Sequence, residues 1–456
     1  PLTLDEFVQQ MNTLQPGLLH KYRVPGVAVA LVHNVEVVWT QGYGLANEDV
    51  GTPVTAQTVF QVASISKSIS AWGVMRLVED GKIELDAPVE QYLASWRIPP
   101  SEFDARGVSV RRLLSHSAGI AAWNFPGTPI DETPPTLIKL LTGAESNDAV
   151  HLNRRPGEKG VYSNADYLIL QLLIEEVTGE SFADYIQGAV LDPLGMQHST
   201  YRWLPALQTT LANGYQISGK PTELRSYPEA AGGLYATAAD IATWLAAGMA
   251  GPNGEPAGRN VLQPQTVALM VTPVPVSQNN DNGLGYVVES LPSGMRMVLH
   301  SGDVLGWRGQ YNALPDQGDG IVVLTNSNAG GRYVVADTVC SWIRWAAGEV
   351  PNVCRIYQAI YLAIPLIAGI GGLFVLASIW RLSTQMRSNR RKLVWPPKSD
   401  RQRRDLLFSF VALVVWWLWV VPRVGLLLPP TFIWISLAFT LWCVASAARG
   451  LAPITT

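Results

Sequence analysis

Three long stretches without a charged residue near the end of the chain constrain its fold most. They cover residues 356–380, 406–422 and 431–448 of the 456 residues. Each approaches the roughly 20 apolar residues that a helix needs to cross a lipid bilayer. A buried core helix explains one such run equally well, but three within the last quarter of the chain favour membrane spans. The sequence therefore predicts three transmembrane helices in a membrane domain over residues 351–456.

The loop between the first two apolar runs, residues 381–405, is strongly basic and predicts the orientation of the chain. Its charged residues are nine basic and two acidic ones: Arg381, Arg387, Arg390, Arg391, Lys392, Lys398, Arg401, Arg403 and Arg404 against Asp400 and Asp405. Basic loops remain in the cytoplasm, so residues 1–350 are expected outside it. A nucleic-acid-binding arm is the alternative interpretation, but the place between two spans favours topology, with Arg423 on the outer side as a minor departure. We expect a multi-pass protein of a bacterial cytoplasmic membrane, with the lipid bilayer as partner and the first domain facing the periplasm or the outside.

The charge of the first 350 residues argues against nucleic acid as a partner. They carry 21 basic and 34 acidic side chains, a net charge of −13, which repels a phosphate backbone. An exported domain needs a targeting signal, and the chain opens at Pro1 without Met, so we expect a mature chain after removal of a signal peptide. Cys340 and Cys354 could pair in an oxidising compartment, and the sequence leaves that pairing open.

Hydrophobic periodicity predicts strands at both ends of the first domain and helices between them. The expected strands are residues 27–32, 35–39, 284–289, 296–300 and 320–325. The expected helices cover residues 4–21 and 331–347, run from Ser64 to near Gly81, and fill most of 110–250. Because strands distant in sequence must join one sheet, we expect a single α/β domain over residues 1–350.

The segment Phe60–Lys67 places a serine and a lysine three residues apart, where a strand-like run gives way to a helical pattern. On one helix face the Lys67 amine would reach the Ser64 hydroxyl. A serine needs an adjacent base to become a nucleophile, and a lysine becomes that base when burial lowers its pKa. The helix N-terminus also offers backbone N–H groups to a developing oxyanion. A surface serine beside a solvated lysine is the alternative, because this tetrad arises by chance about once in a chain of this length.

Two further short motifs carry side chains suited to catalysis. Tyr162-Ser163-Asn164 offers a phenol that can relay protons and a side-chain amide. His300-Ser301-Gly302-Asp303 follows a predicted strand, where a glycine lets a substrate backbone approach closely. The remaining histidines lack metal-ligand spacing, so neither a metal site nor a cofactor is predicted; they are His20, His33, His151 and His198.

The three motifs together resemble the serine β-lactamase and penicillin-binding protein superfamily. The branch they resemble most contains class C β-lactamases, D-alanyl-D-alanine carboxypeptidases, D-aminopeptidases and esterases of the S12 peptidase type. The segments Leu113–Gly119 and Ala231–Tyr235 support the resemblance, which covers about residues 5–347. It implies a β-lactamase/DD-peptidase-like α/β (α+β) fold, with an antiparallel sheet flanked by helices and an all-helical region.

The resemblance also implies a role for each residue of the first two motifs. Ser64 would be the nucleophile that forms an acyl-enzyme. Lys67 and Tyr162 would share the proton transfers, in which one activates Ser64 and Tyr162 protonates the leaving group; how the family divides these roles is disputed. Asn164 would hydrogen-bond the substrate amide and Lys67.

The third motif would complete the substrate site. His300, Ser301, Gly302 and Asp303 would bind substrate, and the backbone N–H groups of Ser64 and Asp303 would form the oxyanion hole. His300 stands where class C β-lactamases carry lysine. Histidine is largely neutral at pH 7, which weakens a fixed cationic site for a substrate carboxylate and makes efficient β-lactamase activity less expected.

Four residues outside the motifs receive a simpler interpretation. His116 is expected to hold its loop. Trp307 and Arg308 either line the pocket or belong to ordinary packing, and Tyr215 is equally undecided.

These observations predict a membrane-anchored serine hydrolase that acts on an amide or peptide with a D-residue, or on an ester. Its layout resembles peptidases that unmask acylated D-asparagine prodrugs in natural-product pathways. One alternative is a β-lactam-binding sensor or penicillin-binding protein with little turnover, although loop 381–405 leaves no room for an effector domain. A weak class C-like β-lactamase and an inactive membrane protein are further alternatives. The sequence leaves the substrate, the D/L preference and the oligomeric state open.

Overall fold

The computed structural model describes residues 2–144, 148–216, 218–276, 281–328, 330–388, 396–397, 399–421 and 432–451. They divide into two compact units, Pro1–Pro351 and Asn352–Thr456.

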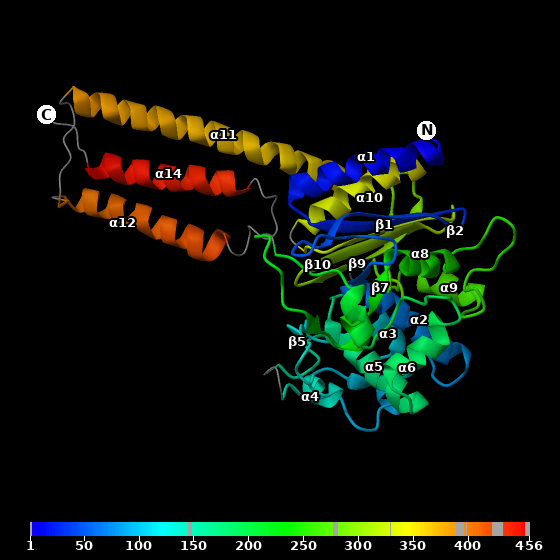
Figure 1. Cartoon of the computed structure of the whole chain (residues 1–456). Helices are drawn as coiled ribbons and strands as arrows, with labels where there is room; N and C mark the ends of the chain where they lie inside the picture. Colours follow the sequence, from blue (N-terminus) through cyan, green and yellow to red (C-terminus); the bar gives the residue numbers. More distant parts are fainter. Residues whose placement is uncertain are drawn as a thin grey trace. The chain divides into compact units, whose positions relative to one another are not determined.

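A seven-stranded antiparallel sheet is the frame of the first unit (Figure 1). Its strands, in spatial order, are β3 (Thr52–Pro53), β2 (Glu36–Asn47), β1 (Gly26–His33), β11 (Asp319–Thr325), β10 (Trp307–Leu314), β9 (Arg296–Val304) and β8 (Val287–Ser290). β1 pairs antiparallel with β11, so that Val27 lies opposite Thr325. The central pairing of the sheet therefore joins the two ends of the unit, as the predicted α/β domain requires.

Strand β10 is absent from the strands predicted above, and this omission is an error of the sequence interpretation. It pairs with β9 and β11 in the middle of the sheet. Its inward residues, Trp307, Tyr311 and Ala313, alternate with polar Arg308 and Gln310. That period of two is the usual signature of a strand and was sufficient to identify it.

The β1–β2 hairpin turns at Asn34 and Val35, one residue later than the gap between the expected strands 27–32 and 35–39. Asn34 and Val35 both adopt positive φ angles, 51° and 59°, as the two central residues of a type I′ turn do. Valine is rare in this conformation, and a backbone hydrogen bond from Val35 to the Gly318 carbonyl (2.9 Å) holds it there.

Helices cover both faces of the sheet (Figure 1). α1 (Leu4–Tyr22) and α10 (Gly331–Ala347) pack together on one face, where Gln15 Nε2 donates to Thr338 Oγ1 at 2.9 Å. α8 (Ala238–Ala247) packs on the other face against β1, β2 and β11. The sheet is therefore buried on both sides, which explains why β1 and β11 are apolar along almost their full length.

An all-helical region lies beyond α8. Its helices are α2 (Ser66–Glu79), α3 (Val110–Leu114), α4 (Leu137–Thr142), α5 (Asn164–Thr178), α6 (Phe182–Ile186), α7 (Glu229–Gly232) and α9 (Pro264–Met270). Two short antiparallel ribbons accompany them: β4 (Val59–Gln61) with β7 (Tyr235–Thr237), and β5 (Thr128–Pro129) with β6 (Arg225–Ser226). The expected helical stretch 110–250 is thus helical in pieces.

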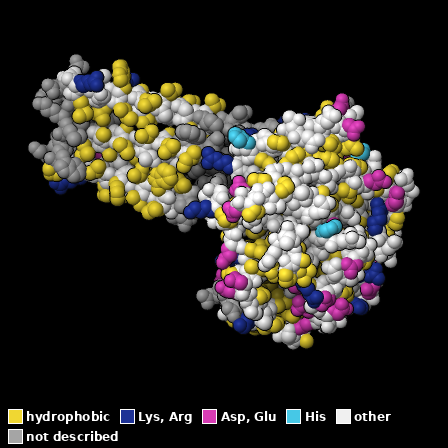
Figure 2. Space-filling view, viewed as in Figure 1, with side chains coloured by type: hydrophobic (Ala, Val, Ile, Leu, Met, Phe, Trp, Pro, Cys, Tyr) yellow, Lys and Arg dark blue, Asp and Glu magenta, His cyan; other side chains and the backbone are white. Residues whose placement is uncertain are grey.

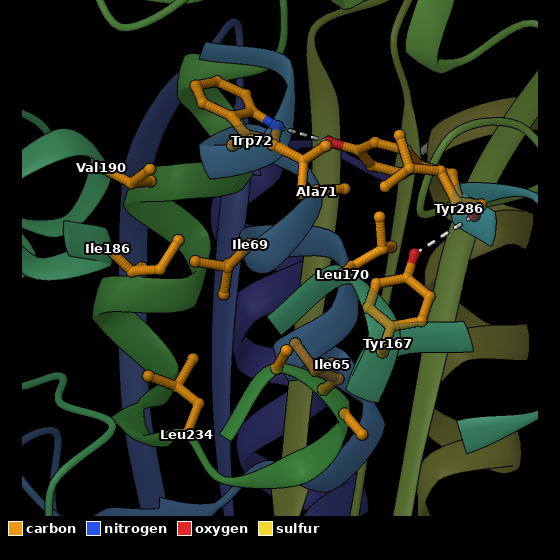
Figure 3. Packing of buried hydrophobic residues seen from close by; sticks show 14 of the residues in the cluster. Ile65, Ile69, Ala71, Trp72, Tyr167, Leu170, Ile186, Val190, Leu234 and Tyr286 are labelled. Carbon is orange, nitrogen blue, oxygen red and sulfur yellow. Dashed lines mark hydrogen bonds between the residues drawn. The ribbon is translucent and has the colours of Figure 1, made fainter. Parts of the chain in front are cut away.

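Helix α2 is the centre of this region, with eleven of its 14 residues buried. Figure 3 shows Ile69 and Trp72 facing Ile186 and Val190, and the Trp72 Nε1–H donates to the Tyr286 hydroxyl at 2.8 Å. A buried polar group costs free energy unless it is hydrogen-bonded. The α2 serines meet this requirement; Ser68 Oγ, for example, donates to the Gly285 carbonyl at 2.6 Å.

The second unit contains the helices α11 (Asn352–Arg387), α12 (Asp400–Val415) and α14 (Phe432–Leu451), with a π-helical turn at Trp416–Val420. α14 packs against both other helices. Large apolar side chains of α11 nevertheless remain 59–69% exposed, namely Leu366, Ile367, Ile370, Leu373 and Phe374. Figure 2 shows hydrophobic side chains spread over the surface of this unit.

Within the described residues, one helix, Leu366–Arg387, is long and apolar enough to cross a membrane by length and composition. The structure therefore supports one such helix where the sequence predicts three. The apolar stretch of α14, Ile435–Ala448, is shorter, and five of the first six residues of α12 are charged. The second and third spans remain predictions, and residues 422 and 431 at their ends lie outside the described residues. So do Arg423 and residues 389–395 and 398 of the basic loop.

Candidate active site

Ser64 lies in a single 3₁₀ turn, η1 (Ala63–Ile65), between β4 and α2. The sequence placed it at the start of the helix itself, which in fact begins at Ser66. Ala63 adopts a left-handed φ of 49°, a conformation that costs an L-residue about 1–2 kcal/mol. Such strain beside a reactive group is typical of functional sites.

Lys67 is one turn further along and is fully buried. Its Nζ lies 3.1 Å from Ser64 Oγ and donates to Asn164 Oδ1 (2.7 Å) and to the Ala231 carbonyl (2.5 Å). Burial lowers the pKa of Lys67 well below its usual value, while the charge of Asp166 acts in the opposite direction. Burial thus shifts Lys67 towards the neutral amine, the form that can accept the Ser64 proton.

Tyr162 approaches Ser64 from the other side, with its hydroxyl 2.7 Å from Ser64 Oγ. The Tyr162 side chain is 46% exposed, but its hydroxyl contacts Ser64 Oγ and its ring lies against Lys67, whose Nζ is 4.9 Å from the ring centroid. Desolvation there raises the pKa of Tyr162 to about 12. Tyr162 thus keeps its proton at neutral pH, which suits a proton donor, whereas Lys67 suits a base.

Asn164 is the first residue of α5, and its two amide atoms have separate partners. Oδ1 accepts from Lys67, and Nδ2 donates to Asn124 Oδ1 at 3.0 Å. The preceding Ser163 caps α5 by accepting from the Ala165 N–H. The cap fixes where the helix begins and thereby aims Asn164 at Lys67.

The third motif lies on β9, which packs against η1. A Cβ atom on Gly302 would lie 2.1 Å from the Val62 carbonyl oxygen, so only glycine lets the strand pass this close to the Ser64 turn. Ser301 and Asp303, on either side, both line the cleft.

His300 is buried, with its Nδ1 2.9 Å from the Ser301 carbonyl oxygen. A carbonyl accepts only, so Nδ1 carries the proton in this contact and Nε2 of the neutral ring is an acceptor. Burial first, and the nearby Lys67 second, lower the pKa of His300 to about 4. His300 is therefore neutral at pH 7 and is no cationic anchor.

The cleft has two lobes that meet at Ser64. One has a volume of about 590 Å³ and contains Tyr162, His300 and Tyr286; the other, of about 400 Å³, has aromatic and apolar walls: Trp123, Phe125, Pro126, Tyr227, Val304 and Leu305. The described residues that line the two lobes include neither lysine nor arginine. Asp303 is shared by both lobes, and its Oδ2 accepts from Arg308 and Arg332 at 3.1 and 3.0 Å.

The structure brings all eight predicted site residues to one cleft or its wall. Of the undecided residues, Trp307 and Tyr215 belong to packing, whereas Arg308 pairs with the cleft residue Asp303. Trp307 is buried and donates Nε1–H to the Ala212 carbonyl. The Tyr215 hydroxyl accepts from the Glu48 N–H at 2.7 Å. Sequence reasoning missed Trp123, Phe125 and Tyr227, although two aromatics in a Pro/Gly-containing loop are a usable signal of a binding wall.

Comparison with known proteins gives a consistent family match. The model of the Beta-lactamase family matches residues 4–339. Among relatives, Protein flp of Staphylococcus aureus (strain MW2) is 25% identical over 329 residues, 70% of this chain and 63% of the relative. Unguisins hydrolase ungD' of Aspergillus campestris is 28% identical over 348 residues, 72% of this chain and 63% of the relative. The chain thus spans less than two thirds of the length of these relatives.

Solved structures share the fold. An octameric penicillin-binding protein homologue from Pyrococcus abyssi has a TM-score of 0.65 at 24% identity, covering 78% of this chain and 81% of its own. SurE, solved with D-Leu, has a TM-score of 0.60 at 23% identity, covering 76% and 77%. D-alanine carboxypeptidase AmpC from Burkholderia cenocepacia has a TM-score of 0.60 at 19% identity, covering 74% and 99%.

Proposed function

Because this chain belongs to the beta-lactamase family, we propose that it is a serine hydrolase that forms an acyl-enzyme on Ser64. One observation carries the proposal: Ser64 Oγ lies 2.7 Å from the Tyr162 hydroxyl and 3.1 Å from Lys67 Nζ. A nucleophile, a base whose pKa is lowered by burial and a phenol that keeps its proton are the groups that acyl transfer needs.

Acylation follows from these contacts. Lys67 Nζ takes the Ser64 proton while Oγ attacks the substrate carbonyl carbon. The backbone N–H groups of Ser64 and Asp303 stabilise the tetrahedral oxyanion. Tyr162 then gives its proton to the leaving nitrogen or oxygen, and the Lys67 ammonium passes the proton that it took from Ser64 to the Tyr162 phenolate, which restores both groups. Water repeats the sequence against the acyl-enzyme and releases the acid.

The cleft favours a substrate without a carboxylate next to the scissile bond. His300 is neutral, and Arg308 and Arg332 are both paired with Asp303. The aromatic lobe suits a bulky apolar acyl group. We therefore propose an interior amide or an ester whose acyl residue has the D configuration. Two structural neighbours, SurE solved with D-Leu and the D-alanine carboxypeptidase AmpC, support the D preference.

The proposal includes a membrane anchor in the second unit, with the first unit outside the cytoplasm. The apolar helix Leu366–Arg387 and the exposed apolar residues of α11 support it. The basic loop 381–405 supports the orientation through the preference of basic loops for the cytoplasm.

Labelling and turnover of purified protein test the proposal together. A fluorophosphonate probe should label the wild type and a Ser101→Ala control, whose serine is exposed and distant in sequence, but not Ser64→Ala. Turnover in Ser64→Ala should fall by about 10⁶-fold. A panel of p-nitrophenyl esters, D- and L-aminoacyl anilides and nitrocefin identifies the substrate class. Labelling that persists in Ser64→Ala refutes the nucleophile, and an acyl-enzyme that lasts for hours identifies a β-lactam-binding protein instead.

A further inference from the structure

We infer that His116 and Asp166 form a buried dyad that positions the Tyr162 phenol for its proton transfer. The inference rests on the proposed hydrolase function and adds two positioning residues to it. From the sequence, His116 was expected only to hold its own loop.

The His116 and Asp166 side chains are in direct contact, and His116 also packs against Tyr162. His116 Nδ1 lies 2.7 Å from Asp166 Oδ2, and the residues are 5% and 1% exposed. The His116 ring packs on the Tyr162 ring, with centroids 4.5 Å apart and planes tilted by 44°. A shift of the imidazole would therefore shift the phenol, whose oxygen must stay in hydrogen-bond reach of Ser64.

The backbone of His116 also holds the segment that carries Tyr162. The Val161 N–H donates to the His116 carbonyl at 2.7 Å, directly before Tyr162. Asp166 lies in the first turn of α5, four residues after Tyr162. The dyad thus holds the chain before Tyr162 through the Val161 hydrogen bond and the chain after it through Asp166, and His116 contacts the Tyr162 ring directly.

Stability alone gives a poor reason for these residues. His116 has a left-handed φ of 56°, which glycine adopts at lower cost. The second oxygen of Asp166, Oδ1, is buried without a hydrogen-bond partner in the part of the chain that the structure describes. A buried unpaired polar atom costs about 1–3 kcal/mol, so an apolar or amide residue would suit a purely structural position better.

The dyad is also electrically linked to the base. The charge of Asp166 raises the pKa of Lys67, and Lys67 in turn lowers that of Asp166 against the effect of burial. Burial and the same Lys67 charge lower the pKa of His116, so its ring is neutral. The short Nδ1–Oδ2 contact places one proton between the two side chains.

Two substitutions separate positioning from folding. Asp166→Asn keeps the shape of the side chain, and His116→Asn tolerates the left-handed backbone while removing the ring. We expect both variants of the full chain to retain the wild-type melting temperature within a few degrees. We expect kcat on an alkyl ester, whose leaving group needs a proton, to fall on the order of 10²-fold, with KM nearly unchanged.

Asp240→Asn is the matched control. Asp240 is likewise a buried aspartate in the first turn of a helix, α8, where it accepts from Ser199 Oγ and the His198 N–H at 2.8 Å. It is absent from the described cleft lining. This variant should lose stability without the selective loss of kcat.

A double-mutant cycle with Tyr162→Phe decides the question, with kcat on the same alkyl ester as the readout and fluorophosphonate labelling as the check that Ser64 remains reactive in each variant. If the dyad acts through Tyr162, Asp166→Asn should have almost no further effect in the Tyr162→Phe background. Multiplicative losses, or an Asp166→Asn variant with wild-type kcat, overturn the inference. Ser64→Ala run in parallel keeps the two hypotheses apart, since residual labelling there refutes the proposed function whatever the cycle shows.

Discussion

Helices α2 and α11 differ in which side chains they bury: α2 buries polar ones, and α11 leaves apolar ones exposed. α2 is almost entirely buried and carries four buried polar side chains, Ser66, Lys67, Ser68 and Ser70. α11 is mainly apolar, and many of its large side chains remain exposed. A buried polar group needs a partner and an exposed apolar one needs an apolar surrounding. Fixed partners for buried polar groups suit α2 to the proposed chemistry, and exposed apolar side chains suit α11 to the proposed anchor.

The largest expected effect comes from removing the proton-transfer groups around α2. Lys67→Ala and Tyr162→Phe should each lower kcat by about 10²–10⁴-fold, because base and acid act on the same proton path through Ser64. The double variant should be scarcely slower than the slower single variant. Steady-state kinetics with circular dichroism as a folding control tests this, and losses that multiply would show that the two residues work independently.

The next largest effect concerns the packing of α2. Trp72 is fully buried, stacks edge-on with Trp244 and donates to Tyr286. Trp72→Ala should lower the free energy of unfolding by about 3–5 kcal/mol, as measured by urea denaturation of the first unit. Trp72→Phe, which keeps most of the volume but loses the hydrogen bond, should cost less. Equal losses in both variants would contradict the packing argument.

Acid should inactivate the enzyme through Lys67. The pKa of Lys67 is lowered in the fold and raised in part by Asp166. The neutral amine is required, so kcat falls as pH drops through that lowered pKa. Asp166→Asn removes the charge that raises it, so the acid limb of the kcat profile should move to lower pH. If the acid limb of the kcat profile stays at the same pH in Asp166→Asn, a group other than Lys67 determines it.

His300→Lys should change specificity by a smaller amount. Replacing a neutral ring by a cation should raise activity on the carboxylate-bearing nitrocefin relative to a neutral ester about fivefold, near 1 kcal/mol of added attraction. His300→Gln is the neutral control and should leave the ratio as it is. An unchanged ratio in His300→Lys would place His300 outside the carboxylate subsite.

The smallest effect is expected from the α11 side of the comparison. A chain that ends at Gly348, the left-handed C-cap of α10, should be soluble and keep kcat on small esters within about twofold, because the catalytic groups precede that point and truncation leaves their distances unchanged. If the truncated protein folds and labels at Ser64 but no longer turns over esters, the second unit contributes more than an anchor.

Short-range sequence signals predicted the reactive groups because their chemistry is local. Ser64 and Lys67 are one turn apart, and Tyr162 and Asn164 flank a helix start, whereas the need for Gly302 comes from the distant Val62 carbonyl. The three motifs were predictable as one site only through the family resemblance, since nothing local indicates that residues 64, 162 and 300 meet.

What the sequence did not predict depends on tertiary contacts. Trp123 and Tyr227 form one wall only because distant loops come together, and His116 contacts Tyr162 through a left-handed backbone that no composition reveals. The alternation of apolar and polar residues in β10 could have identified it as a strand, but the search for continuous apolar runs passed over it. The apolar runs after residue 400 were visible, yet apolarity alone does not set the length of a helix.

Rapid-quench mass spectrometry of the wild-type protein with a p-nitrophenyl ester tests the central claim most directly. We expect the mass of the acyl group to appear on the peptide that contains Ser64 within the first turnover and to disappear as substrate is exhausted. An adduct on any other residue would contradict acyl transfer at Ser64. So would turnover without any adduct, if the slow Tyr162→Phe variant also accumulates none.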